Sequence, residues 1–192
     1  MSLIQLPYHH EDMVIMINQA FGKKTATDEN RAAVAKSQMG IIQSEYDEIS
    51  EACDLMNKDK LRDALADLKV TLFGYPFLVL GQTVTDRIVM SLHESFSVDQ
   101  NTTLPEAAFI KTLNQRIHTE ETKASRRILL QDIESDEDWE ALLGIIERSL
   151  AAEMEALKRK TRKAKYTEAI ESVINLLMTC YRIEQHLGIP TD

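Results

Sequence analysis

Acidic side chains recur at helical spacing in two neighbouring segments of this sequence. Glu45 and Glu48 lie three residues apart, and Asp63 and Asp67 lie four residues apart. Either spacing places both side chains of a pair on one face of an α-helix. Apolar residues flank each pair, so we expect the carboxylates to border a packed core. These four residues are the first candidates for chemistry.

A short turn at residues 57–59 would join the two helices antiparallel and bring the pairs face to face. Like charges that face one another repel unless a cation lies between them. Mg²⁺ suits such a site because it binds oxygen ligands and retains water, with Mn²⁺ as the alternative ion. The cluster therefore predicts metal-assisted hydrolysis of a phosphoanhydride, with Glu45 or Glu48 orienting the attacking water and Glu51 as an outer partner. A solvated acidic face is the alternative interpretation.

The elements that must position these side chains are helices. Apolar residues recur every three or four positions along almost the whole chain, and glycine and proline are few. Capping residues at 27–30 and 135–138 indicate two helix starts, and Pro76 predicts a kink or break near residues 72–76. We predict an all-α helical bundle with helices at 9–21, 27–57, 60–81, 84–97, 105–133, 136–163 and 166–187.

The chain also contains a weak internal repeat. A shift of 108 residues aligns similar residues of the two halves: Glu45 with Glu153, Asp63 with Glu171, Thr71 with Thr179 and Phe73 with Tyr181. Two acids are not preserved, since Glu48 aligns with Ala156 and Asp67 with Asn175. We predict a tandem pseudo-duplication, with one unit at residues 1–97, a linker at 97–103, and a degenerate unit at 104–192 that packs on the first.

The acidic pattern resembles the all-α nucleoside triphosphate pyrophosphohydrolases of the MazG and dimeric dUTPase type. That family has ExxE on one helix and ExxD on the next; Glu45 and Glu48 match the first motif, and Asp67 matches the final Asp. The family's second Glu would align with Ala64, so Asp63 stands in from the neighbouring position. The run from Asp63 to Gly74 is similar to the phage and bacterial branch, and the likeness covers about residues 10–97.

The resemblance implies a MazG-like fold and Mg²⁺-dependent hydrolysis of a (d)NTP to (d)NMP and pyrophosphate, for control of the nucleotide pool. It implies that Asn18 and Phe21 of the first helix help to hold the base. Phe96 and Asp99 stand where relatives keep an Asn and a Lys near the phosphates. The second unit would replace the second subunit of the relatives' dimer. The implied metal ligands are Glu45, Glu48, Asp63 and Asp67.

The composition excludes other classes of function. The formal net charge of −9 disfavours binding to a nucleic-acid backbone. No stretch approaches the ~20 apolar residues needed to span a bilayer. Cys53 and Cys180 lie in helical patterns with no zinc motif, which is typical of buried reduced thiols, and we expect a cytoplasmic protein.

Two rival functions remain at the level of the sequence. A non-catalytic helical adaptor would bind a partner protein and show no affinity for metal. A phosphoribosyl-ATP pyrophosphohydrolase would use similar carboxylates on another substrate. The sequence leaves the base, the sugar and the formation of homo-oligomers open.

Overall fold

The computed structural model describes residues 8–87 and 130–189, and the regular structure there is entirely helical. The all-α prediction is thus confirmed. The predicted helix at 84–97 is described only to residue 87 and is helical from 84, and the described end of the predicted 105–133 helix is a 3₁₀ turn. The linker and residues 105–129 lie outside the described residues. The elements are α1 (Tyr8–Ala20), α2 (Arg31–Asp54), α3 (Lys58–Leu80), η1 (Leu130–Asp132), α6 (Asp136–Arg162) and α7 (Tyr166–Leu187).

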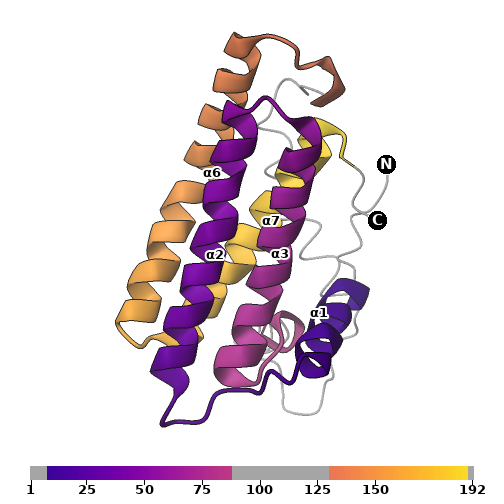
Figure 1. Cartoon of the computed structure of the whole chain (residues 1–192). Coiled ribbons are helices and arrows are strands. Elements are labelled where there is room, and N and C mark those ends of the chain that lie inside the picture. The colour runs from indigo at the N-terminus through magenta and orange to yellow at the C-terminus, as the bar shows by residue number, and fades with distance from the viewer. Residues whose placement is uncertain (1–7, 88–129, 190–192) are drawn as a thin grey trace, which may run out of the picture.

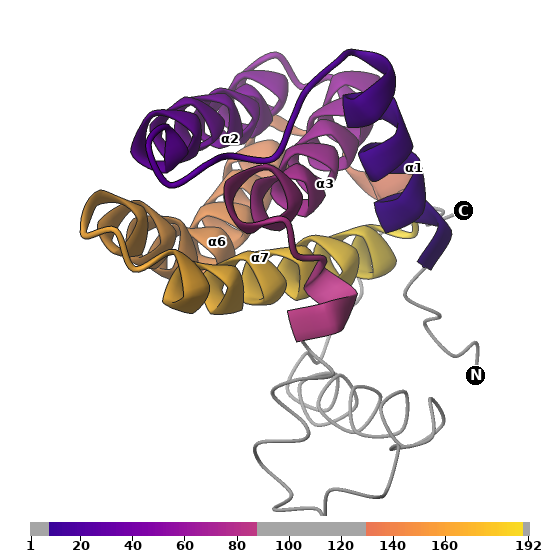
Figure 2. The ribbon, with the colours of Figure 1, turned by 90° about the horizontal axis from the view of Figure 1, so that it is seen from below.

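The long helices form two hairpins that pack on one another. Helices α2 and α3 make the first hairpin, and α6 and α7 make the second. Helix α3 lies against α7 and α2 lies against α6, so the hairpins form a bundle of two layers (Figures 1 and 2). The short α1 packs on α3 at the side of the bundle (Figure 2). The carboxylate-bearing helices are therefore held rigidly by the second hairpin.

The core lies between the layers and consists mainly of Leu and Ile. Leu65 and Leu72 of α3, Ile42 of α2 and Leu150 of α6 are completely inaccessible to solvent. Burial of each such side chain stabilises the fold by about 1.5–3 kcal/mol. Helix α3 is central, because it contacts α1, α2 and α7.

The ends of the helices correct two predictions. Helix α2 begins at Arg31, not residue 27, because the Asn30 side chain accepts a hydrogen bond from the Thr27 amide and holds residues 27–30 in a turn. Helix α3 continues through Pro76 to Leu80, so of the predicted kink or break, the break does not occur. Proline removes only one backbone hydrogen bond, and the buried residues around Pro76 keep the last turns packed. The Ser135 capping box at the start of α6 confirms the other predicted start.

The two hairpins turn in the same way at positions 108 residues apart. Met56 and Ala164 have left-handed backbones, with φ of 50° and 57°. The Met56 amide donates to the Cys53 carbonyl at 2.9 Å, and the Ala164 amide donates to the Thr161 carbonyl at 3.0 Å. The same offset relates the ends of α2 and α6 and the starts of α3 and α7. The offset found in the sequence thus coincides with a repeated local geometry.

The buried faces of α3 and α7 also correspond at this offset. Ten buried residues of α7 are offset from ten buried residues of α3, beginning with Ala169 and Leu61 and ending with Leu187 and Val79. Gly74 and Leu78 are buried only on α3, where Val14 and Asn18 of α1 lie against Gly74. The extra burial therefore follows from the packing of α1.

In the described part of the chain, no helix is both long enough and apolar enough to cross a bilayer.

Replacing Ala164 by glycine should raise the free energy of unfolding by about 0.5–1 kcal/mol. A left-handed backbone costs a residue with a Cβ about 1–2 kcal/mol, and the greater freedom of glycine in the unfolded chain cancels part of that gain. The control is Ala151→Gly in the exposed middle of α6, which should lower the free energy by about 1 kcal/mol. Chemical denaturation of both variants measures the effect, and destabilisation by both would contradict the strain assigned to the turn.

Candidate functional site

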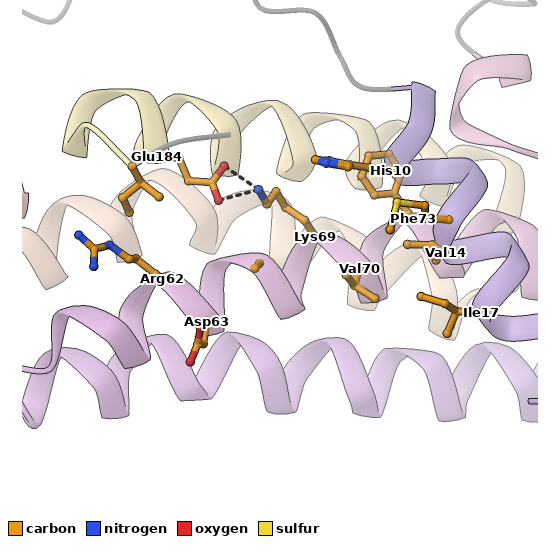
Figure 3. Close-up of a pocket in the computed structure, with 12 residues that line it drawn as sticks. His10, Val14, Ile17, Arg62, Asp63, Lys69, Val70, Phe73 and Glu184 are labelled. Carbon is orange, nitrogen blue, oxygen red and sulfur yellow. Dashed lines mark hydrogen bonds and ion pairs between the residues drawn. The ribbon is translucent and has the colours of Figure 1, made fainter. Parts of the chain in front are cut away.

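The predicted carboxylates lie along the outer side of the first hairpin. Glu45 is partly buried, whereas Glu48, Asp63 and Asp67 are exposed. Asp63 points from α3 toward α2 (Figure 3). Within the described ranges, none of the four has an ion pair or hydrogen bond from its side chain. The hairpin therefore presents several carboxylates on facing helices without a positive partner from residues 8–87 or 130–189.

Glu45 is the member whose electrostatics the fold perturbs. Burial raises the pKa of Glu45 above its ordinary value, and the negative charges of Glu48 and Asp67 raise it further. Glu48 is on the same helix, but Asp67 is on the opposite one. The charges of Glu48 and Asp67 thus act on Glu45 across the hairpin.

At the corresponding positions of the second hairpin, the acidic side chains have a hydrogen-bond or ion-pair partner. Asn175, offset by 108 from Asp67, donates from Nδ2 to Oε1 of Glu153, which is offset from Glu45, at 3.1 Å. Glu171, offset from Asp63, forms an ion pair of 3.7 Å with Lys160. The first hairpin has Ala52 in place of that lysine. At these positions α6 and α7 pair an acid with an amide or an ammonium, whereas α2 and α3 have an acid in place of the amide and an alanine in place of the ammonium.

These carboxylates suit a hard divalent cation in type and reach. Oxygen ligands from two facing helices match Mg²⁺, and the offset positions of the second hairpin lie in direct contact at 3.1 Å. Among the described residues, no three His, Cys, Asp or Glu side chains stand close enough to hold a metal ion as arranged. Closure of a site would require new rotamers of Glu48, Asp63 and Asp67, which exposed side chains can adopt.

The other predicted site residues are Glu51, Asn18 and Phe21, and they lie in three different environments. Glu51 forms an exposed ion pair of 3.5 Å with Lys60, so a salt bridge already engages the proposed outer partner. Asn18 is buried, and its Nδ2 donates to the Val14 carbonyl at 2.9 Å. Phe21 is 80% exposed beyond the end of α1. The structure does not bring Asn18 and Phe21 together in a pocket.

A cavity of about 420 Å³ opens beside the acidic groups, between α1, α3 and α7. This volume falls in the range of small-molecule sites. Asp63 lines the cavity and also faces α2, so the cavity and the acidic side of the hairpin adjoin (Figure 3). Most of its wall is apolar and comes from α1 and α3: Met13, Val14, Ile17, Ala66, Val70 and Phe73.

A buried ion pair lies in the wall of this cavity. Nζ of Lys69 on α3 lies 2.6 and 2.7 Å from the two carboxylate oxygens of Glu184 on α7 (Figure 3). Burial raises the pKa of Glu184, and the lysine lowers it. Lys69 also lies over the ring of Tyr181, 4.6 Å from its centroid, and the Tyr181 hydroxyl is 3.4 Å from Nδ1 of His10. This network was not predicted from the sequence.

Its only signal in the sequence was a lysine and a glutamate within apolar helical stripes. The two residues are 115 positions apart, and the 108-residue shift does not align them. Glu11 was also not predicted, because its partners lie more than 70 positions away in the sequence. Its buried carboxylate accepts hydrogen bonds from Val84 and Thr85, which ties α1 to the chain that follows α3.

Comparisons with protein-family models, with curated proteins and with solved structures give no significant match for this chain.

Replacing Asp67 by Asn should lower the pKa of Glu45, because it removes one of the two negative charges that raise it. In the wild type the folded chain binds this proton more tightly than the unfolded chain. Burial of the charged carboxylate, together with its repulsion by Glu48 and Asp67, therefore destabilises the fold above the raised pKa, and the cost disappears as the pH falls below 4.5. Carboxyl NMR titration measures the shift.

Glu155 on α6 is the internal control, since its lowered pKa depends on Lys158 and should not change. An unaltered midpoint for Glu45 in Asp67→Asn would show that the two carboxylates do not interact.

Proposed function

We propose that this chain is a Mg²⁺-dependent nucleoside triphosphate pyrophosphohydrolase that converts a (d)NTP to (d)NMP and pyrophosphate. The observation that supports it best is the contrast between the hairpins. Glu45, Glu48 and Asp67 oppose one another on the first, whereas Glu153 and Asn175 satisfy each other on the second. Like charges kept together on one hairpin alone favour a role that needs a cation.

In this proposal, Glu45, Glu48, Asp63 and Asp67 hold the metal, with Mn²⁺ as the alternative ion. When bound, the ion would neutralise charge on the phosphate oxygens of the substrate. Glu45, which is partly buried on α2, would accept a proton from the attacking water. Glu48 would orient that water from the next turn of the same helix.

The adjoining cavity would hold the nucleoside. Its apolar wall suits a flat ring, and Asp63 connects it to the acidic side of the hairpin. Arg62, at the cavity and 45% exposed on its side chain, could exchange its ion pair with Asp59 for a phosphate. This position supplies a positive charge that Phe96 and Asp99 do not.

The second hairpin would then be a degenerate copy of the first. Ala156 and Asn175 replace two acids, and Lys160 neutralises a third. One chain would carry one working site, and the second hairpin would support it. The matched turns at Met56 and Ala164 favour this origin.

The test is pyrophosphate release from each common NTP and dNTP, with and without Mg²⁺. Glu45→Gln and Asp67→Asn should each reduce kcat/KM by on the order of 10²-fold or more, because each removes a charge from the metal site. The matched control is Glu153→Gln, the same change at the offset position, which should leave the rate within about twofold.

Metal-independent release, or an equal loss in Glu153→Gln, would contradict the assignment of the site. If the folded wild type releases no pyrophosphate from any nucleotide, the proposed activity is wrong and the helical adaptor becomes the better reading.

A further inference from the structure

The Lys69–Glu184 pair is not required by the packing of the bundle. The positions offset by 108 are Leu177 and Pro76, and both are buried and apolar. The α3–α7 interface thus accommodates apolar side chains at these places in its other half. A buried ion pair costs the desolvation of two charges, and replacing both partners by apolar residues is often neutral or stabilising. Stability alone does not account for the pair.

The difference between the two places is the cavity. Lys69 and Glu184 line it, and among its charged lining residues they are the two that are buried. Helix α1, which closes one side through Met13, Val14 and Ile17, packs on α3. A charged pair is therefore present where a small molecule has room to reach it.

The pair retains capacity for one kind of hydrogen bond. A carboxylate offers about four lone-pair sites, and Lys69 occupies one on each oxygen of Glu184. The ammonium is turned to the two oxygens and to the Tyr181 ring. The Glu184 carboxylate can thus still accept a hydrogen bond, and an N–H group can donate it.

The charges around the cavity disfavour an anionic or a fully apolar ligand group. Lys69 and Glu184 neutralise each other, and the lining also includes the opposite charges of Arg62 and Asp63. A ligand anion beside Glu184 would be repelled, and a fully apolar ligand would leave the remaining lone pairs of the carboxylate desolvated.

We propose that Glu184, held by Lys69, is the recognition group of this cavity and binds the ring N–H of a flat, largely apolar heterocycle. The second hairpin thereby contributes a specificity-determining residue to the site of the first. Only the identification of the ring as the base of a nucleotide rests on the proposed function. In that case a base with a ring N–H beside a carbonyl is the preferred class.

The first experiment uses two fragments that differ in one N–H. The full-length protein is titrated with 2-pyridone and with N-methyl-2-pyridone, and the methyl NMR signals of Met13, Val14 and Val70 report binding. We expect 2-pyridone to bind about tenfold more tightly, because only it donates to a charged acceptor. Equal affinities, or no binding of either fragment to the folded protein, would overturn the proposal.

The variant that tests the residue changes both partners together. Lys69→Met with Glu184→Met preserves volume and leaves no unpaired buried charge, so it should fold. It should bind the two fragments with affinities within about twofold of each other. A preference for 2-pyridone that survives in the double variant would show that Glu184 does not recognise the N–H.

A nucleotide assay separates this inference from the proposed activity. In the double variant, KM for the preferred nucleotide should rise about tenfold while kcat stays within about threefold, since neither Lys69 nor Glu184 is among the proposed metal ligands. Hydrolysis with an unchanged KM would overturn the role of Glu184 and leave the activity standing. Selective fragment binding without hydrolysis by the wild type would support the role of Glu184 and overturn the proposed activity.

Discussion

Each helical hairpin of this chain has one apolar stripe that it cannot bury by itself, and the whole structure depends on burying the two against each other. Leu65 and Leu72 of α3 are excluded from water in the packed bundle, and Val173 and Cys180 of α7 are equally buried. Because α3 pairs with α7 and α2 with α6, the long helices keep fixed positions. That rigidity holds acidic residues on facing helices together despite their repulsion.

The bundle contains two groups of charged side chains, one exposed to solvent and the other buried. On the outer side of α2 and α3, the carboxylates remain partly or fully hydrated, so solvent limits the cost of their proximity. Between α3 and α7, Lys69 and Glu184 are removed from water and must compensate each other directly. The exposed carboxylates are accessible to a cation, and the buried pair is suited to hydrogen bonding with a neutral polar group. Asp63 lies at the junction of the two.

The sequence predicts this fold well where the determinants are local. Helical periodicity locates α6 and α7 almost to their ends, and the Ser135 box marks a true start. Spacing along α2 and α3 places Glu45 opposite Asp67, because a short turn leaves two helices few ways to align. Local signals fail where tertiary packing decides. The break at Pro76 does not occur, and Asn18 is drawn into the contact of α1 with Gly74 while Phe21 is left in solvent. No local pattern could pair Lys69 with a residue more than a hundred positions away.

The paired hairpins have a further consequence that concerns symmetry. In an assembly of two identical subunits, every substitution occurs twice, so an acid lost from one hairpin is lost from both. A chain that carries both hairpins escapes this restriction, and one half can change while the other is preserved. Asn175 opposite Glu153, and a lysine at 69 where the offset residue is Leu177, are differences that two identical subunits could not have. Covalent linkage thus permits charge to be distributed unequally, so that facing acids can lie on one hairpin while a contact such as Glu153 with Asn175 is confined to the other.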